Sequence, residues 1–541
     1  MGSCLTARIT ECRMSILLPF LVLSCVLPLS AGIWSPASEQ LATPTTHAER
    51  GLDFARAGQL EKAEAELRQA VELAPSDVEV LATLGTVLAQ EQKLEESTEL
   101  FRRALRINSS NLTVRRYLAA NLWQLHRYPE AREHLQIILK RKPDDKAAQL
   151  LLGMVSENMG DYATAARMLA AVPDEVQEQA ESIAALARSY YHLHQTENAR
   201  AALAQLAGQQ AGLSAVLGAQ IADEMQDYPT AEKLLASIPA LLRDLPRIQY
   251  TTALVEYHAG HFDRSQNILE TLIASGNKNA AILNLLGWCH HHQGQPQEAR
   301  QSLEESIALA PAEEASYLDL TKILLAQRAL PSALRAANRT VDGFPNSAAA
   351  FELQGLVEVR IGQFTDAVRS YTHASELDRS SPEPILGLAQ AQSAAGMSKE
   401  AAGSFKTGIE RFPRDARFRA QYAALLLRES ETGEVALEAK AEQLLRSALA
   451  LDPSLSDGHY QLGNLALNKD RVTEAQQHLE QAVQLDGQNA AAHFALSRVY
   501  RRLGRRPDAA HEMELYESLK QEPGNDNSTP ANTALPEQPH P

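Results

Sequence analysis

The sequence of 541 residues contains few cysteines and few aromatic residues. Three of the four cysteines, Cys4, Cys12 and Cys25, lie close to the first residue, so a chain without that segment keeps Cys289 alone. A lone cysteine forms neither an internal disulfide nor a zinc site of paired cysteines. Aromatic residues make up only 5% of the chain, while alanine and leucine dominate. This composition favours closely packed helices over a β-sandwich or barrel.

Positive charge is also scarce, because 51 lysines and arginines face 67 acidic residues and the formal net charge is −16. Nonspecific nucleic-acid binding needs a basic surface that displaces counterions, so we expect no nucleic-acid partner. With 45% hydrophobic and 22% charged residues the composition is that of an ordinary soluble protein. At this length the chain exceeds one compact domain unless it is a repeat array.

One uncharged apolar run occurs at residues 14–33. Arg8 and Arg13 precede it, and the small residues 30–32 stand at its end. A positive segment, an apolar run and a small-residue cleavage site follow one another in this order in secretory signals. We therefore predict a signal peptide over residues 1–32.

Export would place the mature protein in the periplasm or cell envelope. Residues 33–43 are then a short linker before the folded region. Two alternatives stay open for the same segment. Residues 15–33 are close to the length of a membrane anchor, and Cys25 follows a sequence that loosely resembles a lipoprotein cleavage box.

A 34-residue repeat fills most of the remaining chain, as LGTVLAQEQKLEESTELFRRAL (84–105) and LGNLALNKDRVTEAQQHLEQAV (462–483) illustrate. Each segment has Gly second, a small residue twelve positions later and a large apolar residue four further on. The first small position recurs at Gly51, Gly85, Ala119, Gly153, Ala187, Ala219, Ala253, Gly287, Thr321, Gly355, Ala389, Ala423, Gly463 and Ser497. The second recurs at Ala63, Ser97, Ala131, Ala165, Ala199, Ala231, Ser265, Ala299, Ala333, Ala367, Ala401, Ala441, Ala475 and Ala509.

Two antiparallel helices approach closely only where their side chains are small, so these positions predict helix crossings. Proline closes several units, where the second helix must stop. The pattern resembles the tetratricopeptide repeat family over about residues 44–522. The resemblance implies an all-α, right-handed superhelical solenoid of about fourteen helix–turn–helix repeats.

The predicted organisation has four parts after the linker. Regular repeats 1–5 occupy residues 44–205 and repeats 7–14 occupy residues 244–522. Residues 206–243 form a divergent sixth repeat, because second helices there end early. Residues 523–541 are polar and proline-rich, which is typical of a disordered tail. About six extra residues between 429 and 437 are either loop drift or a functional protrusion.

The resemblance also implies a binding surface, because family members usually bind ligands on the concave face formed by the first helix of each pair. Applying the family's inward positions gives two patches and one isolated candidate. The first patch contains Tyr191, His192, Tyr250, Tyr257, His258, Asn284, Trp288, His291 and His292. The second contains Arg498, Arg501 and Arg502, and Trp123 is the isolated candidate.

Each patch has two interpretations. The rings suit a peptide groove, or they merely coat a helix face. The arginines suit a carboxylate, phosphate or anionic headgroup, or they form a solvated terminal face.

The segment GWCHHHQGQPQEA at 287–299 raises the question of a metal or Cys/His site. Its place in the repeat makes it a first helix, a turn and the start of a second helix. Consecutive residues on a helix point about 100° apart, so three adjacent histidines cannot all face one ion. We expect Cys289 to pack against a neighbouring helix and predict no metal site.

We expect no catalytic residue and no cofactor, because the chain lacks a phosphate-binding glycine loop, a G-x-S-x-G motif and an H-E-x-x-H motif. The sequence predicts a non-catalytic scaffold that binds protein or peptide partners at the cell envelope. An assembly factor or chaperone for an exported secretion, pilus or polysaccharide system is the alternative. An enzyme with its site on the repeats is a third, less favoured hypothesis.

Overall fold

The structure is a computed structural model that describes residues 43–208, 213–430 and 435–521. Within these ranges all regular secondary structure is helical. The predicted signal, linker and tail, and the middle of the insertion at 429–437, lie outside the described residues. None of the described helices combines the length and apolarity needed to cross a membrane.

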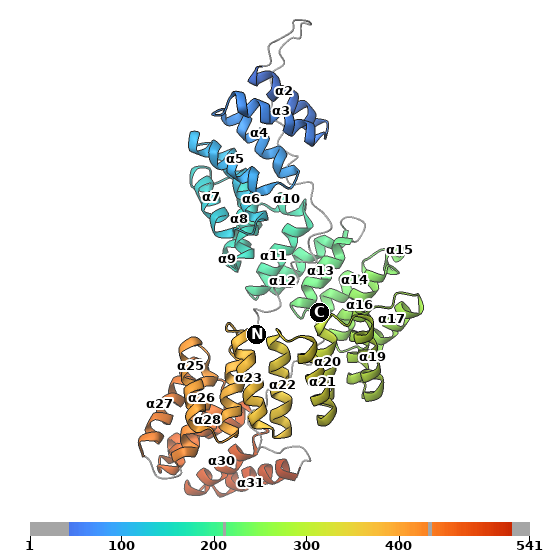
Figure 1. Ribbon diagram of the computed structural model, residues 1–541. Helices are drawn as coiled ribbons and strands as arrows, with labels where there is room; N and C mark the ends of the chain where they lie inside the picture. Colours follow the sequence, from blue (N-terminus) through green and yellow to red (C-terminus); the bar gives the residue numbers. More distant parts are fainter. Residues whose placement is uncertain (1–42, 209–212, 431–434, 522–541) are drawn as a thin grey trace. The chain divides into compact units, whose positions relative to one another are not determined.

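The helices group into two compact units, which end and begin at Ala259 and Gly260 (Figure 1). The N-terminal unit contains α2 (Pro44–Arg56), α3 (Leu60–Leu73), α4 (Val78–Gln90), α5 (Leu94–Ile107), α6 (Leu112–Gln124), α7 (Tyr128–Arg141), α8 (Lys146–Asn158), α9 (Tyr162–Ala170), α10 (Pro173–Gln177), α11 (Ala180–His192), α12 (Thr196–Ala204), the 3₁₀ helix η1 (Gln205–Gly208), α13 (Leu213–Glu224), α14 (Tyr228–Ala236), α15 (Ala240–Arg243) and α16 (Pro246–His258).

The C-terminal unit contains α17 (Phe262–Ala274), α18 (Ala280–His292), α19 (Pro296–Leu309), α20 (Glu314–Ala326), α21 (Leu330–Gly343), α22 (Ala348–Ile361), α23 (Phe364–Leu377), α24 (Glu383–Ala394), α25 (Ser398–Arg411), α26 (Ala416–Ser430), α27 (Val435–Leu451), α28 (Ser456–Asn468), α29 (Val472–Leu485), α30 (Ala490–Arg502) and α31 (Arg506–Gln521). Apart from α10, η1 and α15, first and second helices alternate along the chain. The expected all-α repeat fold is confirmed.

The starts of first helices show why the chain folds with this period. Asp77, Asn111 and Asp145 stand 34 residues apart, and each side chain accepts a hydrogen bond from a backbone N–H in the first turn of α4, α6 or α8. Asx side chains at this position satisfy donors that a helix start otherwise leaves unpaired. The turn between the two helices contains a left-handed residue, which is Gly160 in one repeat and Gln92 in another.

The crossing of the two helices in a pair depends on the predicted small residues. A Cβ atom added at Gly85 would lie 2.6 Å from Cε1 of Phe101, the large residue of the same helix pair. The small residue of the second helix is fully buried in most repeats, as Ala63 and Ala299 show with no exposed surface. The large residue therefore packs under the glycine within one hairpin, and not only between neighbouring hairpins.

The region around the predicted divergent repeat has shortened second helices. Helices α9, α12 and α14 have nine residues each, whereas regular second helices such as α3 have fourteen. The segments α10, η1 and α15 follow them directly. Val176 of α10, Leu206 of η1 and Ile238, which lies between α14 and α15, are buried in the hydrophobic core of the N-terminal unit, whereas α15 itself has no buried residue. Helix α10, η1 and the residues between α14 and α15 thus fill the space that the short helices leave.

Helices around the insertion are longer than their counterparts. Helix α26 has 15 residues and ends at Ser430, and α27 has 17 and begins at Val435. Part of the inserted sequence therefore extends these two helices.

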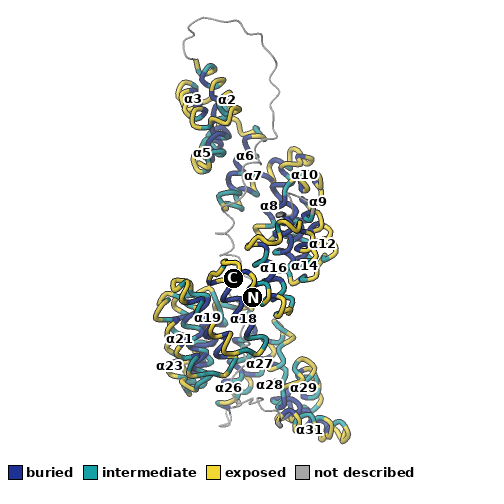
Figure 2. Tube along the Cα trace, turned by 90° about the vertical axis from the view of Figure 1, so that its right-hand side faces the viewer, coloured by how far each residue is buried: buried dark blue, intermediate teal, exposed yellow. Residues whose placement is uncertain are grey.

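Burial follows the stacking of neighbouring pairs. In each unit the buried residues run through the middle of the stacked helices, and exposed residues mark the turns and outer sides (Figure 2). Within each unit, first helices such as α4 and α22 pack against their own second helix and against helices of the adjacent repeats. Each unit therefore has an elongated core built from contacts between chain neighbours.

Candidate functional site

The structure divides the predicted aromatic–histidine patch between the two units. Tyr191, His192, Tyr250, Tyr257 and His258 belong to the N-terminal unit, on α11 and α16. The remaining members, from Asn284 to His292, lie on α18 in the C-terminal unit. The predicted patch therefore consists of two halves, one in each unit.

Tyr191 on α11 is held inside the N-terminal unit. Its side chain is 9% exposed, and its hydroxyl donates a 2.9 Å hydrogen bond to Oδ2 of Asp227. Nε of Arg200 lies 2.7 Å from the same oxygen. Burial raises the pKa of the Tyr191 hydroxyl, and the bond to Asp227 acts in the same direction. The three side chains join the repeat of α11 and α12 to the next one.

His192 and His258 occupy the last residues of α11 and α16. The His192 ring is stacked on Tyr162 at 3.9 Å between centroids and 10° between planes. Desolvation lowers the pKa of His192. Nδ1 of His258 lies 2.8 Å from Oδ2 of Asp223. Both imidazoles thus have defined partners, and His192 also has an exposed edge.

Three other candidates of the N-terminal unit, Trp123, Tyr257 and Tyr250, differ in how much surface they leave exposed. Trp123 on α6 is half-buried and packs against two hydrophobic clusters of this unit. Tyr257 is 3% exposed, with its ring centroid 5.7 Å from that of His258. Tyr250 is half-buried, and desolvation raises the pKa of its hydroxyl. Of these rings, Trp123 and Tyr250 keep some surface that a ligand could contact.

The structure brings Trp288, His291 and His292 together on α18. The Trp288 centroid lies 5.8 Å from that of His291 and 6.0 Å from that of His292. His292 is stacked on Phe262 of α17 at 4.4 Å and 6°. Trp288 is 2% exposed, and its Nε1 has no hydrogen-bond partner among the described residues. The two half-buried histidines are the accessible part of this cluster.

Three ring contacts between a second helix and the next first helix share a spacing that the sequence prediction missed. Tyr162 with His192, Tyr228 with His258 and Phe262 with His292 are each 30 residues apart. In each pair the aromatic residue opens a second helix and the histidine closes the next first helix. A search for pairs at this offset would have found the contacts in the sequence.

A second missed feature is a buried polar network between α18 and α20. Asn284 Nδ2 donates to Oδ2 of Asp319 at 3.0 Å and to Oγ of Ser316 at 3.3 Å. Lys322 Nζ lies 3.3 Å from Oδ1 of Asp319. Burial lowers the pKa of Lys322, and attraction to Asp319 opposes this effect. Asn284 is therefore held by protein groups in this structure.

Cys289 lies in the packed interior, as its helical position predicts. It has no exposed surface, and its Sγ donates to Oγ of Ser265 on α17 at 3.3 Å. Burial raises the pKa of its thiol to about 11. His290 points to a different partner, with Nδ1 2.6 Å from Oε1 of Gln295. The thiol is protonated at neutral pH and is not a reactive nucleophile.

The arginine patch lies on α30. Nη1 of Arg502 binds Oδ1 of Asp470 at 2.8 Å and the carbonyl oxygen of Leu467 at 3.0 Å. Arg501 donates hydrogen bonds to Ser497 of its own helix. Arg498 is half-buried and Arg501 is exposed. Arg502 is thus partly neutralised, whereas Arg498 and Arg501 have no carboxylate within salt-bridge distance in the described part of the chain.

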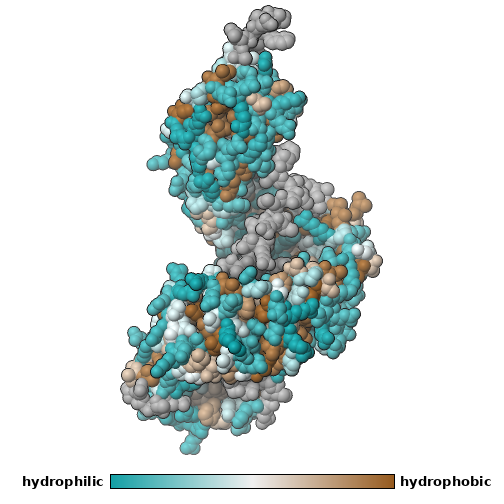
Figure 3. All heavy atoms as spheres, in the orientation of Figure 1, coloured by the Kyte–Doolittle hydropathy of each residue, from teal (hydrophilic) through white to brown (hydrophobic). Residues whose placement is uncertain are grey.

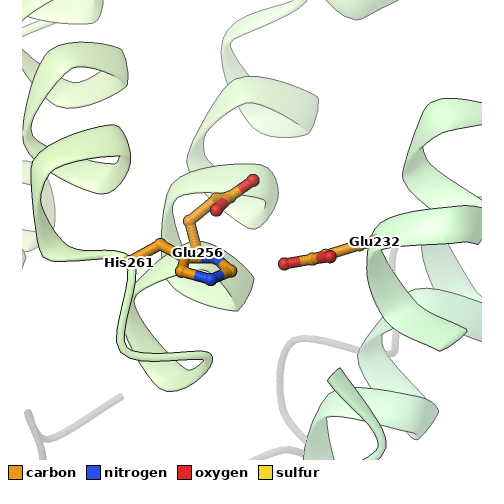
Figure 4. A group of neighbouring side chains, drawn as sticks. All are labelled: Glu232, Glu256 and His261. Carbon is orange, nitrogen blue, oxygen red and sulfur yellow. The ribbon is translucent and has the colours of Figure 1, made fainter. Parts of the chain in front are cut away.

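Two carboxylates of the N-terminal unit also lie close together. Glu232 on α14 and Glu256 on α16 place oxygens within 4.8 Å of each other (Figure 4). His261, labelled in the same view, belongs to the C-terminal unit. Two carboxylates fall short of the ligand set of a protein zinc site, so we assign no metal to the pair.

Comparisons with known proteins agree with this architecture. Sequence profiles of the tetratricopeptide repeat match residues 49–111, 88–155, 250–314 and 460–523. Human protein O-mannosyl-transferase TMTC3 is 25% identical over 194 residues, which is 36% of this chain and 21% of that protein. The chain therefore spans about a fifth of that relative's length.

Solved structures include similar helical arrays. Yeast Tom70 is 15% identical with a TM-score of 0.41, and the match covers 88% of this chain and 92% of that chain. The Cut9–Hcn1 complex of the APC/C is 16% identical with a TM-score of 0.36, covering 89% and 96%. The repeat profiles and the succession of in-register helix pairs show that this chain belongs to the tetratricopeptide repeat family.

Proposed function

We propose that the protein is a non-catalytic scaffold that binds an extended or helical protein segment on the faces of its first helices. The observation that carries this proposal is the set of accessible rings at the ends of first helices. His192 and His292 each combine a stacked face with remaining surface, and the half-buried His291 contacts Trp288 and His292 edge-on. Rings already held by stacking lose little entropy when a partner binds, which suits a peptide-binding surface.

The visible surface supports peptide binding of mixed character. On the face shown in Figure 3, hydrophobic side chains form strips between hydrophilic ones over the stacked helices. Alternating strips suit a segment that has both apolar and polar side chains.

Site-specific photo-crosslinking tests the proposal. A photoreactive amino acid at position 291 or 292 should trap the same discrete protein in the native host. The matched control is position 511, because His511 is an exposed histidine on the second helix α31. Equal adducts at 291 and 511, or adducts at neither, would refute binding at the first-helix faces.

The identity of the trapped proteins separates the two binding hypotheses. One abundant folded partner supports a static scaffold. A range of unfolded exported precursors supports the alternative, an assembly factor or chaperone. The enzyme hypothesis has its own test: stoichiometric metal that is lost in His291→Ala and His292→Ala variants would support it and contradict the scaffold.

We also propose export to the periplasm or cell envelope. The support is the order of charge, apolar run and small residues in the first 32 positions. Fractionation and the intact mass of the mature protein test this. Cleavage after Ala31 or Gly32 is expected, whereas a retained apolar segment indicates an anchor and a lipidated Cys25 indicates a lipoprotein. An uncleaved cytosolic product would contradict export.

A further inference from the structure

The last helix pair has an exposed surface of aromatic and basic side chains. Phe494 on α30 is 39% exposed, and its centroid lies 5.1 Å from that of Tyr516 on α31. Nζ of Lys520 lies 5.8 Å from the Tyr516 ring centroid. Arg498 and Arg501 follow Phe494 at intervals of four and three residues, so the three lie on one face of α30. We call these five residues the terminal basic stripe.

The positive charge of the stripe is not neutralised by neighbouring acids. Arg502 and Arg505, close by, pair with Asp470 and Asp508 at 2.8 Å and 2.7 Å. Among the described residues, no carboxylate lies within salt-bridge distance of the three cations of the stripe. An exposed ring flanked by unneutralised cations suits an acidic segment that also has apolar groups.

The chain itself contains such a segment directly after α31. Residues 522–541 contain Glu522, Asp526 and Glu537 and neither lysine nor arginine. The segment also contains five prolines, two of them in the sequence Pro-Glu-Gln-Pro at 536–539. Proline-rich segments dock on aromatic-lined surfaces with little loss of entropy. Prolines would contact the rings, and the acids would pair with the cations.

The segment that begins at residue 522 also starts close to one end of the terminal basic stripe. Glu512 contacts His493 and Tyr516 contacts Phe494, so α31 runs antiparallel to α30. Gln521 therefore ends α31 near the Phe494 end of the stripe. Helix α30, with 13 residues, is about 20 Å long. A random chain of 16 residues spans about 20–24 Å on average, which is enough to reach Arg501.

We propose that residues 522–541 dock on the terminal basic stripe of their own chain and compete there with acidic partner segments. A covalent tether of this length supplies an effective concentration on the order of 1 mM. With an affinity on the order of 100 µM for the free segment, most molecules would have the stripe covered. An acidic partner would then have to displace the segment. This inference does not depend on the identity of any partner.

A binding experiment with the segment itself tests the proposal. A fluorescently labelled peptide of residues 522–541 is titrated with the full chain and with a chain truncated after Gln521. Fluorescence anisotropy at low salt should show binding to the truncated chain that is about tenfold tighter than to the full chain, in which the attached segment competes. Rising salt should weaken the binding, because it rests on charge.

Charge reversal locates the binding surface. In the truncated chain, Arg498→Glu with Arg501→Glu should weaken peptide binding at least tenfold. The matched control is Arg506→Glu with Arg414→Glu, which changes the charge by the same amount at two exposed arginines outside the stripe. Circular dichroism verifies that all variants keep their helix content.

A charge swap guards against indirect effects. A peptide with Asp526→Lys and Glu537→Lys should bind the doubly reversed chain better than the native peptide does. No binding to the truncated chain, equal binding to full and truncated chains, or an equal loss in the control variant would each overturn the proposal. The partner-crosslinking experiment can fail without affecting this result, so the two proposals are judged separately.

Discussion

Tyr371 fills the space between two glycines of successive first helices. An added Cβ at Gly387 would lie 2.4 Å from Cε1 of this ring, and one at Gly355 would lie 2.8 Å from Cδ2. The rigid ring is 6% exposed and cannot move aside without disturbing both repeats. Gly387→Ala should therefore lower the free energy of unfolding by about 1–3 kcal/mol, although alanine favours a helix.

Gly403 provides the matched control for this substitution. It lies in the next helix, α25, and is exposed, and a Cβ added there would have no other described residue within 4 Å. Gly403→Ala should leave stability unchanged or raise it by about 0.5–1 kcal/mol. Hydrogen exchange of the peptides from α23 and α24 measures both effects. Equal protection in the two variants would show that Tyr371 does not limit the crossing.

Histidines at one inter-helix contact make the stability depend on pH. Nδ1 of His459 and Nδ1 of His478 lie 3.0 Å apart, and burial, followed by repulsion from His459, lowers the pKa of His478. The folded state therefore resists a proton that the unfolded state accepts. Above about pH 6.5 the imidazole is neutral in both states, so the contact does not reduce the free energy of unfolding. As the pH falls below that value, the free energy of unfolding decreases.

His478→Glu should reduce this acid sensitivity. The substitution recreates the pair found 34 residues later, where Nδ1 of His493 lies 2.6 Å from Oε2 of Glu512. Protection factors of α28 and α29 at pH 7.5 and 5.5 measure the effect. The native chain should lose protection in these helices at pH 5.5, whereas the variant should keep it. The opposite order would show that the imidazole pair is not the source.

At the scale of elements, the segment after α14 tests whether the extra pieces of the divergent region are structural. Ile238 has no exposed surface and belongs to the core of the N-terminal unit. Leu241, three residues later, is 89% exposed. Ile238→Ala should lower the free energy of unfolding by about 2–4 kcal/mol, because it leaves a cavity.

Leu241→Ala is the matched control and should change stability by less than about 0.5 kcal/mol. Chemical denaturation followed by circular dichroism compares the two variants. A similar loss in both would contradict the assigned packing. A loss in neither would show that the segment after α14 adds nothing to the core.

The elements themselves were largely predictable from the sequence. Small residues such as Gly287 and Ala299 recur in register, and their role at the crossings follows from helix packing alone. The pieces that fill the divergent region were not predictable, because α10, η1 and the residues between α14 and α15 are each much shorter than one repeat period. Their burial depends on neighbouring repeats and not on local pattern.

At the scale of the whole molecule, the predicted site shows which contacts can be predicted from a residue's position in the 34-residue repeat and which cannot. Register placed Trp288, His291 and His292 on one helix, where the structure shows them in contact. It did not show that Tyr191 binds Asp227, because that bond joins residues 36 positions apart through an irregular repeat. The repeat pattern also did not predict that the residues of the first patch belong to two different units.

The same neighbour-only contacts predict how a local defect spreads. Helix α4 packs against α2, α3, α5 and α6, which are close to it in the chain. Gly85→Val would press a side chain against Phe101, since even a Cβ at this position lies 2.6 Å from the ring. In a one-dimensional array of repeats, such strain weakens the affected repeat and its neighbours and fades beyond them.

Hydrogen exchange should therefore show lost protection in α3–α6 of the Gly85→Val variant and unchanged protection in α28–α31. Calorimetry of the same variant should show a transition of smaller enthalpy at a lower temperature than the main transition, because distant repeats keep their own stability. A single transition that moves as a whole, with uniform loss of protection up to α31, would require coupling beyond neighbouring repeats. The protein would then respond to a partner at one end as a unit, whereas local unfolding would confine that response to the repeats in contact.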